Sequence, residues 1–251
     1  MLEPKRAVFP LLVIFSLSAC SVLEDRDSCP CTLGFVTASD VGCVHLLLDA
    51  GNGFLWEESV EDLGGSLFQV PREMLRCCIV QGAEPGPEGS VIIPEGEDCP
   101  EIRMHRSVID ARCAAVTDTV EFHKSYCVMD ICLEGREAFG LRNLEVKSST
   151  AGYDRYGESV EGVFRHSPSR LRDGTYRLRL PRQLSPDLEI EAEFLSGGGA
   201  VFPLGAYLDD MDYDWNAEDL GDVVIRIDSR SSSVRIITSC WQKSFSFDLR
   251  I

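Results

Sequence analysis

Eight residues decide the fold class of this chain: Asp187-Leu188-Glu189-Ile190-Glu191-Ala192-Glu193-Phe194. Acidic and apolar side chains alternate strictly along this stretch. Successive side chains of a β-strand point to opposite faces, so the pattern predicts a strand with one face on a core and the other in water. Polar and apolar residues also alternate in residues 177–180 and 245–251. Residues 222–228 place Val223, Ile225 and Ile227 on one side, and residues 234–238 are the expected hairpin partner of this strand. Strands with one wet face are typical of antiparallel sheets, and the sequence therefore predicts an all-β protein.

Turn-forming residues separate these strands at short intervals, which supports a β-sandwich. Gly197-Gly198-Gly199 predicts a hairpin turn, and residues 85–100, which are rich in Gly, Pro and acids, predict a long surface loop. Residues 57–63 are the one stretch in which we expect a short helix.

A short sequence pattern that occurs twice indicates two similar sandwiches in tandem. Residues 67–75 and residues 177–184 each read as a strand that ends in Pro-Arg-x-(Met/Leu), and the two stretches lie one module length apart. We therefore expect a first sandwich over residues 33–119 and a second over residues 120–251.

Composition and charge exclude several classes of protein and one class of partner. The chain has 251 residues, of which 44% are hydrophobic and 26% charged, and these values argue against a disordered chain and against a polytopic membrane protein. The formal net charge is −17. Because nucleic acids are bound through Lys and Arg side chains that neutralise phosphates, we predict no nucleic-acid partner.

The N-terminus has the pattern of a lipoprotein signal peptide. A basic start and an apolar run over residues 7–17 lead into Leu17-Ser18-Ala19-Cys20, which matches a bacterial lipobox. This predicts that residues 1–19 are removed and that Cys20 carries two or three acyl chains such as palmitate, which anchor the protein in a membrane. The alternative is an ordinary secretory signal that happens to contain a cysteine. If Cys20 is lipidated, residues 20–32 form a lipidated acidic tether.

Ten cysteines remain once Cys20 is lipidated, and an even number outside the cytosol predicts disulfides. Their spacing does not assign the partners. If every cysteine pairs, at least one disulfide joins the two sandwiches, and the alternative is that some stay free as small buried residues. The ten are Cys29, Cys31, Cys43, Cys77, Cys78, Cys99, Cys113, Cys127, Cys132 and Cys240.

We predict no metal site and no cofactor. The sequence has no Cys-x-x-Cys pair, and its four histidines lack the spacing of zinc ligands. Asp210, Asp212 and Asp214 match the first three ligand positions of an EF-hand calcium loop, but Trp215 stands where the loop needs glycine and Gly221 where it needs a bidentate glutamate. A looser calcium site near these aspartates stays open, beside the alternative of an acidic turn that caps the residues after it.

We also predict that the protein is not an enzyme. The sequence contains no Gly-x-Ser-x-Gly elbow, no P-loop and no Gly-x-Gly-x-x-Gly motif. A pair of carboxylates for glycoside hydrolysis stays open, because their spacing is spatial and not sequential. Trp56, Trp215 and Trp241 are expected in the core or at module edges, and the alternative is that they stack on sugar rings.

Several stretches together carry a resemblance to a known family. An acidic segment follows the lipobox cysteine, and after it come Asp27-Ser28-Cys29-Pro30-Cys31-Thr32-Leu33, residues 157–164, residues 180–183, residues 202–207 and the most specific stretch, Tyr213-Asp214-Trp215-Asn216-Ala217-Glu218-Asp219-Leu220. In order and spacing they resemble the Bacteroidales fimbrial anchor lipoproteins, the FimB-like partners of fimbrillin. The resemblance covers about residues 20–245, and residues 43–115 match weakly.

This resemblance implies two tandem transthyretin-like antiparallel β-sandwiches and an outer-membrane lipoprotein, exposed at the cell surface and held by lipid on Cys20. It implies that the protein anchors a type V fimbria, that it limits the length of the fimbria, and that it has no enzymatic activity. The expected partners are fimbrillin shaft subunits and other fimbrial components, bound by β-strand addition to a sheet edge. Residues 245–251 are a candidate strand for this contact, and the alternative is that they close a sheet of this chain.

Two other functions stay open from the sequence. A surface glycan-binding lipoprotein of a polysaccharide uptake complex would have the same anchor and sandwiches, with aromatic side chains gathered on an exposed face. A lipid-anchored hydrolase would need converging carboxylates or a Ser–His pair. Which fimbrillin is bound, how the cysteines pair and which strand meets the shaft do not follow from the sequence.

Overall fold

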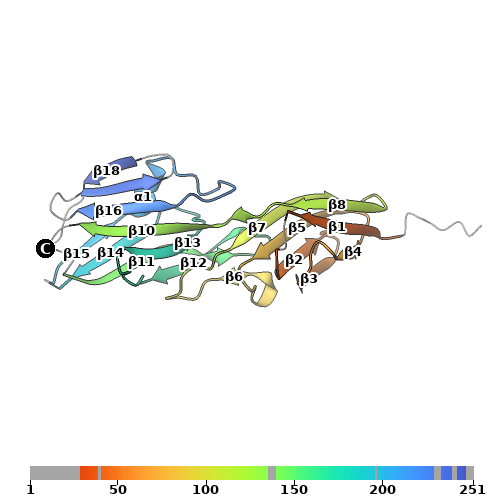
Figure 1. The fold of residues 1–251 in the computed structure, drawn as a ribbon, viewed down its shortest axis with the longest axis horizontal. Helices are drawn as coiled ribbons and strands as arrows, with labels where there is room; N and C mark the ends of the chain where they lie inside the picture. Colours follow the sequence, from red (N-terminus) through yellow and green to blue (C-terminus); the bar gives the residue numbers. More distant parts are fainter. Residues whose placement is uncertain are drawn as a thin grey trace, which may run out of the picture.

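The computed structural model describes residues 29–38, 41–134, 140–195, 197–228, 233–238 and 242–246. Nearly all regular structure in this part of the chain is β-strand, with one α-helix and one short 3-10 helix. The strands build two β-sandwiches that lie end to end, which makes the molecule elongated (Figure 1). The predicted tandem β-sandwich fold is confirmed.

The first sandwich packs a three-stranded sheet, in the order β4-β1-β8, against a five-stranded sheet, in the order β3-β2-β5-β7-β9. Its strands are β1 (Cys31–Thr37), β2 (Val44–Asp49), β3 (Leu55–Val60), β4 (Leu67–Val70), β5 (Met74–Gln81), β7 (Arg103–Asp110), β8 (Ala115–Val120) and β9 (His123–Lys124).

The second sandwich packs the sheet β13-β10-β16-β17-β18 against the sheet β12-β11-β14-β15, and the short strand β6 pairs with β11 from the first half of the chain. Its elements are β6 (Val91–Ile92), β10 (Tyr126–Glu134), β11 (Leu141–Tyr153), β12 (Ser159–His166), β13 (Tyr176–Pro181), β14 (Glu189–Phe194), β15 (Gly199–Phe202), α1 (Leu204–Asp209), β16 (Val223–Asp228), β17 (Ser233–Thr238) and β18 (Gln242–Ser246). The 3-10 helix η2 (Pro87–Gly89) precedes β6.

Both sandwiches have the same strand order. In the first, β1 lies between antiparallel β4 and parallel β8, and in the second, β10 lies between antiparallel β13 and parallel β16. The facing sheets also correspond, β3-β2-β5-β7 with β12-β11-β14-β15. The echoed prolines occupy equivalent places, because Pro71 follows β4 and Pro181 ends β13. The second sandwich differs in having β17 and β18, which extend its sheet beyond β16.

One parallel strand pair in each sandwich departs from the purely antiparallel expectation. These pairs are β1 with β8 and β10 with β16, the first and last strands of the shared strand order. A parallel pair needs a long connection between its strands. The intervening strands, which cross to the facing sheet and back, supply that connection.

The alternating stretch that predicts the fold forms β14 as expected. Ile190 and Ala192 are buried, whereas Glu193 on the other face is exposed. The predicted glycine-rich hairpin turn is also confirmed, because β14 pairs with β15 across it and the Phe194 N–H donates to the carbonyl of Gly198 at 2.9 Å.

Residues 57–63 do not form the expected helix. They begin within β3, which pairs with β2 over its whole length, from Val60 opposite Val44 to Leu55 opposite Asp49. The apolar strand β2 needs a hydrogen-bonded neighbour on this side, and that pairing outweighs the helix propensity of the local glutamates.

Residues 85–100 are more than the expected surface loop. Val91, Ile93 and Cys99 are buried, and β6 pairs with β11 of the second sandwich. The Ile93 N–H donates to the carbonyl of Ala151 at 2.8 Å. We call residues 87–99 the strap, because they leave the first sandwich and run along the second. The strap is one of the contacts that position the two sandwiches relative to each other.

The strap depends on a glycine at the point where it meets β11. Gly152 has a φ of +147° and lies opposite Ile92, and a Cβ there would overlap the carbonyl oxygen of Val91. We expect Gly152→Ala to lower the free energy of unfolding by about 3 kcal/mol, because the overlap adds to the backbone strain. Chemical denaturation measures the change.

Gly42→Ala is the matched control for this prediction. Gly42 also has a positive φ, of +65°, but a Cβ there would meet nothing within 4 Å. Strain alone should cost about 1 kcal/mol. Equal losses in the two variants would show that the strap does not press on β11.

Candidate functional site: the joint and the two ends

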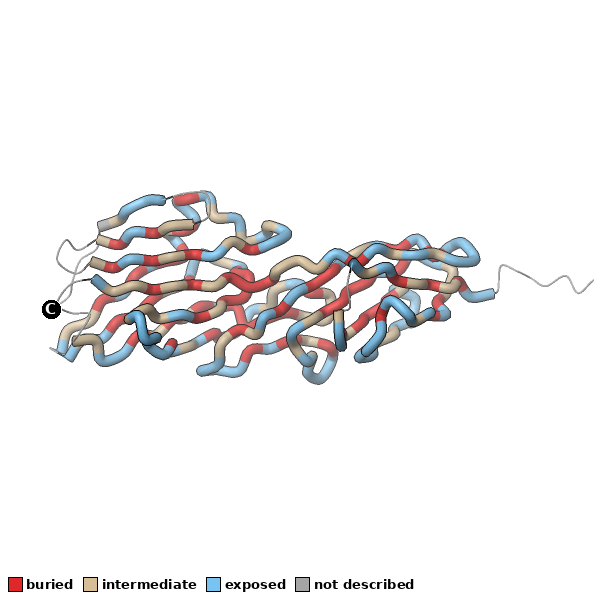
Figure 2. The backbone as a smooth tube through the Cα atoms, in the orientation of Figure 1, coloured by how far each residue is buried: buried red, intermediate tan, exposed pale blue. Residues whose placement is uncertain are grey.

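The two sandwiches share a hydrophobic core where they meet. Adjacent residues of a strand point to opposite faces, and β2 has buried apolar side chains on both of its faces. Leu46 packs into the core of the first sandwich, whereas Leu47 packs with Val80 and Met104 into the core of the second. All four side chains are nearly inaccessible to solvent. Buried segments accordingly continue through the junction (Figure 2). We call this region the joint.

Tyr153, at the end of β11, fixes the chain where it passes between the sandwiches. Its side chain is fully buried, and burial raises the pKa of its hydroxyl. The hydroxyl donates to the carbonyl of Ser125 and accepts the N–H of Arg182 at 2.8 Å. One buried phenol therefore ties the start of β10 to the end of β13.

Arg182 holds the acidic loop of residues 210–222 against the joint. Its guanidinium donates to the carbonyls of Trp215, Ala217 and Glu218 at 3.1, 2.5 and 2.7 Å. Arg182 is only 8% exposed, and burial lowers the pKa of its guanidinium, although an arginine stays charged. Backbone carbonyls thus compensate a buried charge without a carboxylate partner.

A second link on this loop joins it to the end of the first sandwich. Asp219 accepts the backbone N–H of Lys124 at 2.6 Å, and this hydrogen bond lowers the pKa of its carboxyl. Lys124 also forms an ion pair with Asp222. The loop therefore contacts both sandwiches.

A third link closes another side of the joint. The Tyr156 hydroxyl, in the turn after β11, donates to the carboxylate of Asp49 at 2.8 Å, and Arg76 lies over the Tyr156 ring at 4.5 Å. The backbone N–H of Gly51 and the Tyr156 hydroxyl lower the pKa of the Asp49 carboxyl. The same hydrogen bond raises the pKa of Tyr156. Beside it, Arg106 pairs with Glu158 at 2.7 Å.

This third link predicts a pH dependence of stability with two limits. The lowered pKa of Asp49 means that its contribution is complete above the ordinary Asp value and is lost as the pH falls through the lowered pKa. The raised pKa of Tyr156 means that its contribution is complete below the ordinary Tyr value and is lost as the pH rises through the raised pKa. We expect Tyr156→Phe to cost about 1 kcal/mol of unfolding free energy between about pH 5 and 9. Denaturation of both proteins across this range measures the difference, which should shrink at both ends. A difference that stays constant from pH 2 to 11 would contradict the link.

Removal of the Arg182 guanidinium tests the clamp on the acidic loop. We expect Arg182→Met to lower the free energy of unfolding by roughly 3 kcal/mol, because three partly buried carbonyls lose the donor that a buried guanidinium supplies. Arg172→Met is the control, since Arg172 is exposed in a turn and its side chain donates to no carbonyl among the described residues. Calorimetry compares the two variants. A loss in Arg182→Met no larger than in Arg172→Met would mean that the guanidinium contributes nothing to the joint.

The residues predicted to carry special chemistry are placed as follows. Cys20 and Trp241 lie outside the described residues. Asp210 pairs with Lys243, and Asp214 accepts the N–H of Asn216 at 2.8 Å in a turn. In the part of the chain that the structure describes, no three or more His, Cys, Asp or Glu side chains gather where they could hold a metal ion.

The expected disulfides are not present in the described part of the chain, where nine cysteines are free thiols. Five of them are buried in the two cores, which fits the alternative of small core residues. Burial raises the pKa of Cys78 to about 12, so that this thiol stays protonated and unreactive.

A Ser–His–Asp grouping exists but lacks the arrangement of a nucleophilic triad. The Asp118 carboxylate accepts hydrogen bonds from Ser107 Oγ at 2.6 Å and from His105 Nε2 at 3.1 Å. His105 Nδ1 accepts the N–H of Glu121 at 3.2 Å. In a triad the histidine stands between serine and aspartate, whereas here the aspartate stands between them and both ring nitrogens are engaged. The grouping bridges β7 and β8, the two sheets of the first sandwich.

Surface hollows of the described chain offer little platform for sugars. Four hollows of about 300 to 660 Å³ are lined mainly by polar and small residues, and the one Phe, Tyr or Trp side chain among them is Tyr156, which is held by Asp49. Trp56 packs edge-on against Phe68 and Trp215 against Tyr213, as expected for core or module-edge residues.

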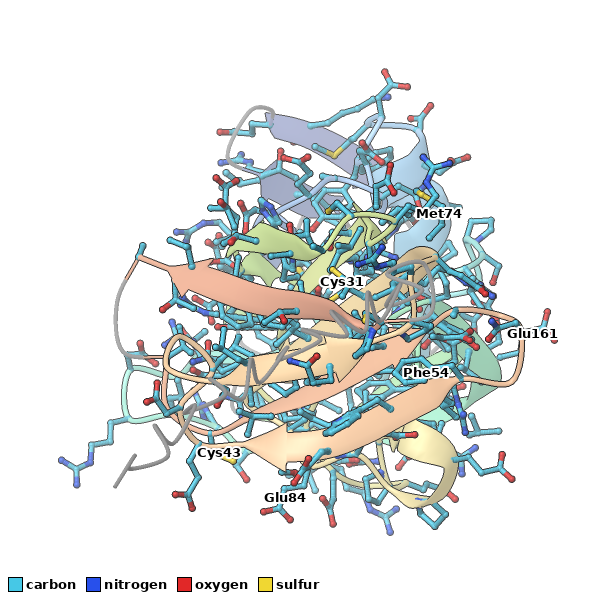
Figure 3. All side chains as sticks on the ribbon, turned by 90° about the vertical axis from the view of Figure 1, so that its right-hand side faces the viewer. Cys31, Cys43, Phe54, Met74, Glu84 and Glu161 are labelled. Atoms are coloured by element: carbon cyan, nitrogen blue, oxygen red, sulfur yellow. The ribbon has the colours of Figure 1, made fainter. Side chains whose placement is uncertain are left out.

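The two ends of the elongated molecule differ in what they present. β1, the first described strand, begins at the end formed by the first sandwich, and Figure 3 shows this end with Cys31 near its middle. β18, the last described strand, forms an edge of the second sandwich. No helix in the described ranges has the length and apolar character required to cross a membrane.

Solved structures share this architecture at low sequence identity. A Bacteroides thetaiotaomicron protein proposed to bind polysaccharide matches with a TM-score of 0.64 and 10% identity, over 87% of this chain and 98% of its own. The fimbrial anchor protein Mfa2 from Porphyromonas gingivalis matches with a TM-score of 0.58 and 9% identity, over 85% of this chain and 98% of its own. A fimbrial assembly protein from Parabacteroides distasonis matches with a TM-score of 0.54 and 11% identity, over 87% of this chain and 100% of its own. The chain has the fold of these proteins.

These matches agree with the resemblance to fimbrial anchors found in the sequence, because the structures similar to this chain include a fimbrial anchor and a fimbrial assembly protein. None of the three is described as an enzyme. The sequence itself matches no family model and no curated protein.

Proposed function

We propose that this protein is an outer-membrane lipoprotein that anchors a type V fimbria at the cell surface. The observation that carries the proposal is the match to a fimbrial anchor over 85% of this chain and 98% of that protein, in a chain whose N-terminus contains a lipobox. In this role the acyl chains on Cys20 supply the membrane attachment, at about 0.8 kcal/mol for each buried CH₂. The acidic tether then leads into β1.

The elongated shape suits an anchor. The lipidated tether would connect to the fold at the end where β1 begins, and the second sandwich lies at the opposite end (Figure 1). A load between membrane and shaft therefore passes through the joint. The shared core, Arg182 and the Asp49–Tyr156 link resist bending there, because bending would expose apolar surface and break partly buried hydrogen bonds.

The proposed contact with the fimbrillin shaft is β-strand addition at β18. This strand pairs with β17 on one side and has no strand neighbour on the other within the described residues. Phe245 stacks on Tyr207 at 4.3 Å between ring centroids and Lys243 pairs with Asp210, so β18 is held in place as an edge. Unpaired edge groups can hydrogen-bond to a strand from another subunit.

The same arrangement accounts for a limit on fimbrial length. Growth by strand addition requires each subunit to engage a neighbour at both ends. A subunit whose first end is held by lipid on Cys20 offers only its second end, so elongation stops when it joins. Neither a cofactor nor an enzymatic step is required.

Loss of the lipid tests the anchoring role. In cells that carry Cys20→Ala, we expect fimbriae to be released into the medium, because the shaft keeps its protein contact but has no membrane attachment. Immunoblots of fimbrial subunits in cells and in medium measure the release. Cys29→Ala is the control, since Cys29 is exposed and lies outside the lipobox. Fimbriae that stay on Cys20→Ala cells at the wild-type level contradict the proposal.

Deletion of residues 245–251 tests the strand contact. We expect a folded protein that no longer binds fimbrillin, with a stability loss of about 1 to 2 kcal/mol from the missing Phe245–Tyr207 stack. Pull-down with fimbrillin and circular dichroism measure binding and fold. Leu195→Ser, which changes an exposed residue beside the β14–β15 hairpin, should bind normally. General unfolding of the deletion variant, or unchanged binding by it, would remove the case for β18.

A further inference from the structure

Two cysteines meet where the chain enters the fold. Cys31 is the first residue of β1 and is fully buried. β1 runs parallel to β8, with Thr32 opposite Ala115, and the Thr32 N–H donates to the carbonyl of Ala114 at 3.0 Å. Cys113 precedes Ala114 in the bend that leads into β8 and is exposed.

This register brings the two cysteines within disulfide range. Cys31 lies in the row of Ala114, and Cys113 stands one residue before that row. With strands about 4.8 Å apart and a rise of about 3.3 Å per residue, an extension of this register would place their Cα atoms about 6 Å apart, inside the range of about 4.4 to 6.8 Å that disulfides require. The thiols also interact: after burial, the charge and hydrogen bond of Cys113 are the next causes that raise the pKa of Cys31.

Other neighbouring cysteines do not satisfy this geometry. Cys77 and Cys78 are adjacent in β5 and face different cores. Cys99 and Cys127 lie on opposite sides of β13, because the Cys99 N–H donates to Arg179 while Cys127 pairs with Leu180 from β10. That separation is two strand spacings, roughly 9.5 Å, which is too far for a disulfide without backbone movement.

We propose that Cys31 and Cys113 form a disulfide when the protein reaches an oxidising compartment. The inference rests on the proposed export of the protein, and the structure describes the reduced form of this pair. The disulfide would join the first residue of the fold after the tether to the start of β8. A pull on the tether would then reach β8 directly and would not load the β1–β8 hydrogen bonds alone.

The chemistry is a thiol–disulfide exchange with an oxidised dithiol protein or glutathione disulfide. The exposed Cys113 loses its proton, and its thiolate attacks the disulfide of the oxidant, which releases one thiolate and leaves a mixed disulfide on Cys113. Cys31 then loses its proton and attacks the Cys113 sulfur, which releases the second thiolate. Two electrons pass to the oxidant, both released thiolates take up the two protons, and one S–S bond forms.

Trypsin makes the pair directly observable. Cleavage leaves Cys113 alone in residues 113–124, whereas Cys31 shares residues 27–72 with Cys29 and Cys43. In the double variant Cys29→Ser/Cys43→Ser, residues 27–72 therefore contain Cys31 as their one cysteine. The full chain with these changes is extracted from cells in detergent, exposed to glutathione disulfide, alkylated in denaturant without reduction, digested and analysed by mass spectrometry.

We expect the two peptides to be linked, and to separate on reduction. Oxidation should raise Tm by roughly 10 °C relative to the reduced protein, and the rise should vanish in Cys113→Ser, which changes only an exposed side chain. Alkylation of both Cys31 and Cys113 in the oxidised protein overturns the proposal. So does a linked peptide in the parent chain that disappears in Cys29→Ser alone, because Cys29 would then be the partner.

Alkylation of intact cells before extraction separates this inference from the proposed function. A linked pair on cells supports both. A pair that forms with glutathione disulfide but is reduced on cells contradicts the oxidising location, whereas thiols that stay free under both conditions contradict the pairing itself.

Discussion

Burial of apolar side chains on both faces of the central strands β2 and β5 is the constraint on which the rest of this structure depends. One face of β2 and β5 closes the first sandwich, and the other face completes the core of the second. Neither face can be exposed without a large loss of hydrophobic free energy, at roughly 25 cal/mol per Å² of apolar surface. The two sandwiches are therefore joined as one rod and not linked as separate beads. The strap, the Arg182 clamp and the Asp49–Tyr156 link each lie where this shared core meets solvent.

The polar part of the joint follows from the apolar part. Once β2 and β5 bury apolar side chains on both faces, the strand ends and loops around them carry backbone groups that must find hydrogen-bond partners. Arg182 supplies donors to three carbonyls of the acidic loop, and Tyr153 serves one carbonyl and one N–H.

The fold class was predictable from the sequence because strand periodicity is a local property. The alternation at residues 187–194 and the turn at Gly197-Gly198-Gly199 correspond to β14 and its hairpin with β15. The failures are non-local: β3 forms because β2 needs a neighbour, and residues 85–100 are held by pairing with residues about sixty positions away in the sequence. Of the joint residues, Arg182 had a signal as part of the repeated Pro-Arg stretch, and the acidic loop had one in residues 213–220, which resemble a known family. Nothing in the pattern around Asp49 and Tyr156 indicates that they meet.

The proposed role joins two features at opposite ends of this rod, a lipidated cysteine before β1 and a sheet edge at β18. The competing role as a glycan-binding lipoprotein shares the first feature but needs an aromatic platform, which the described hollows lack. Crosslinking of intact cells, followed by purification of this protein and mass spectrometry of what is attached, tests the central claim most directly. The account predicts fimbrial subunits in the crosslinked products. Outer-membrane transporter components without any fimbrial subunit would contradict it and favour glycan capture.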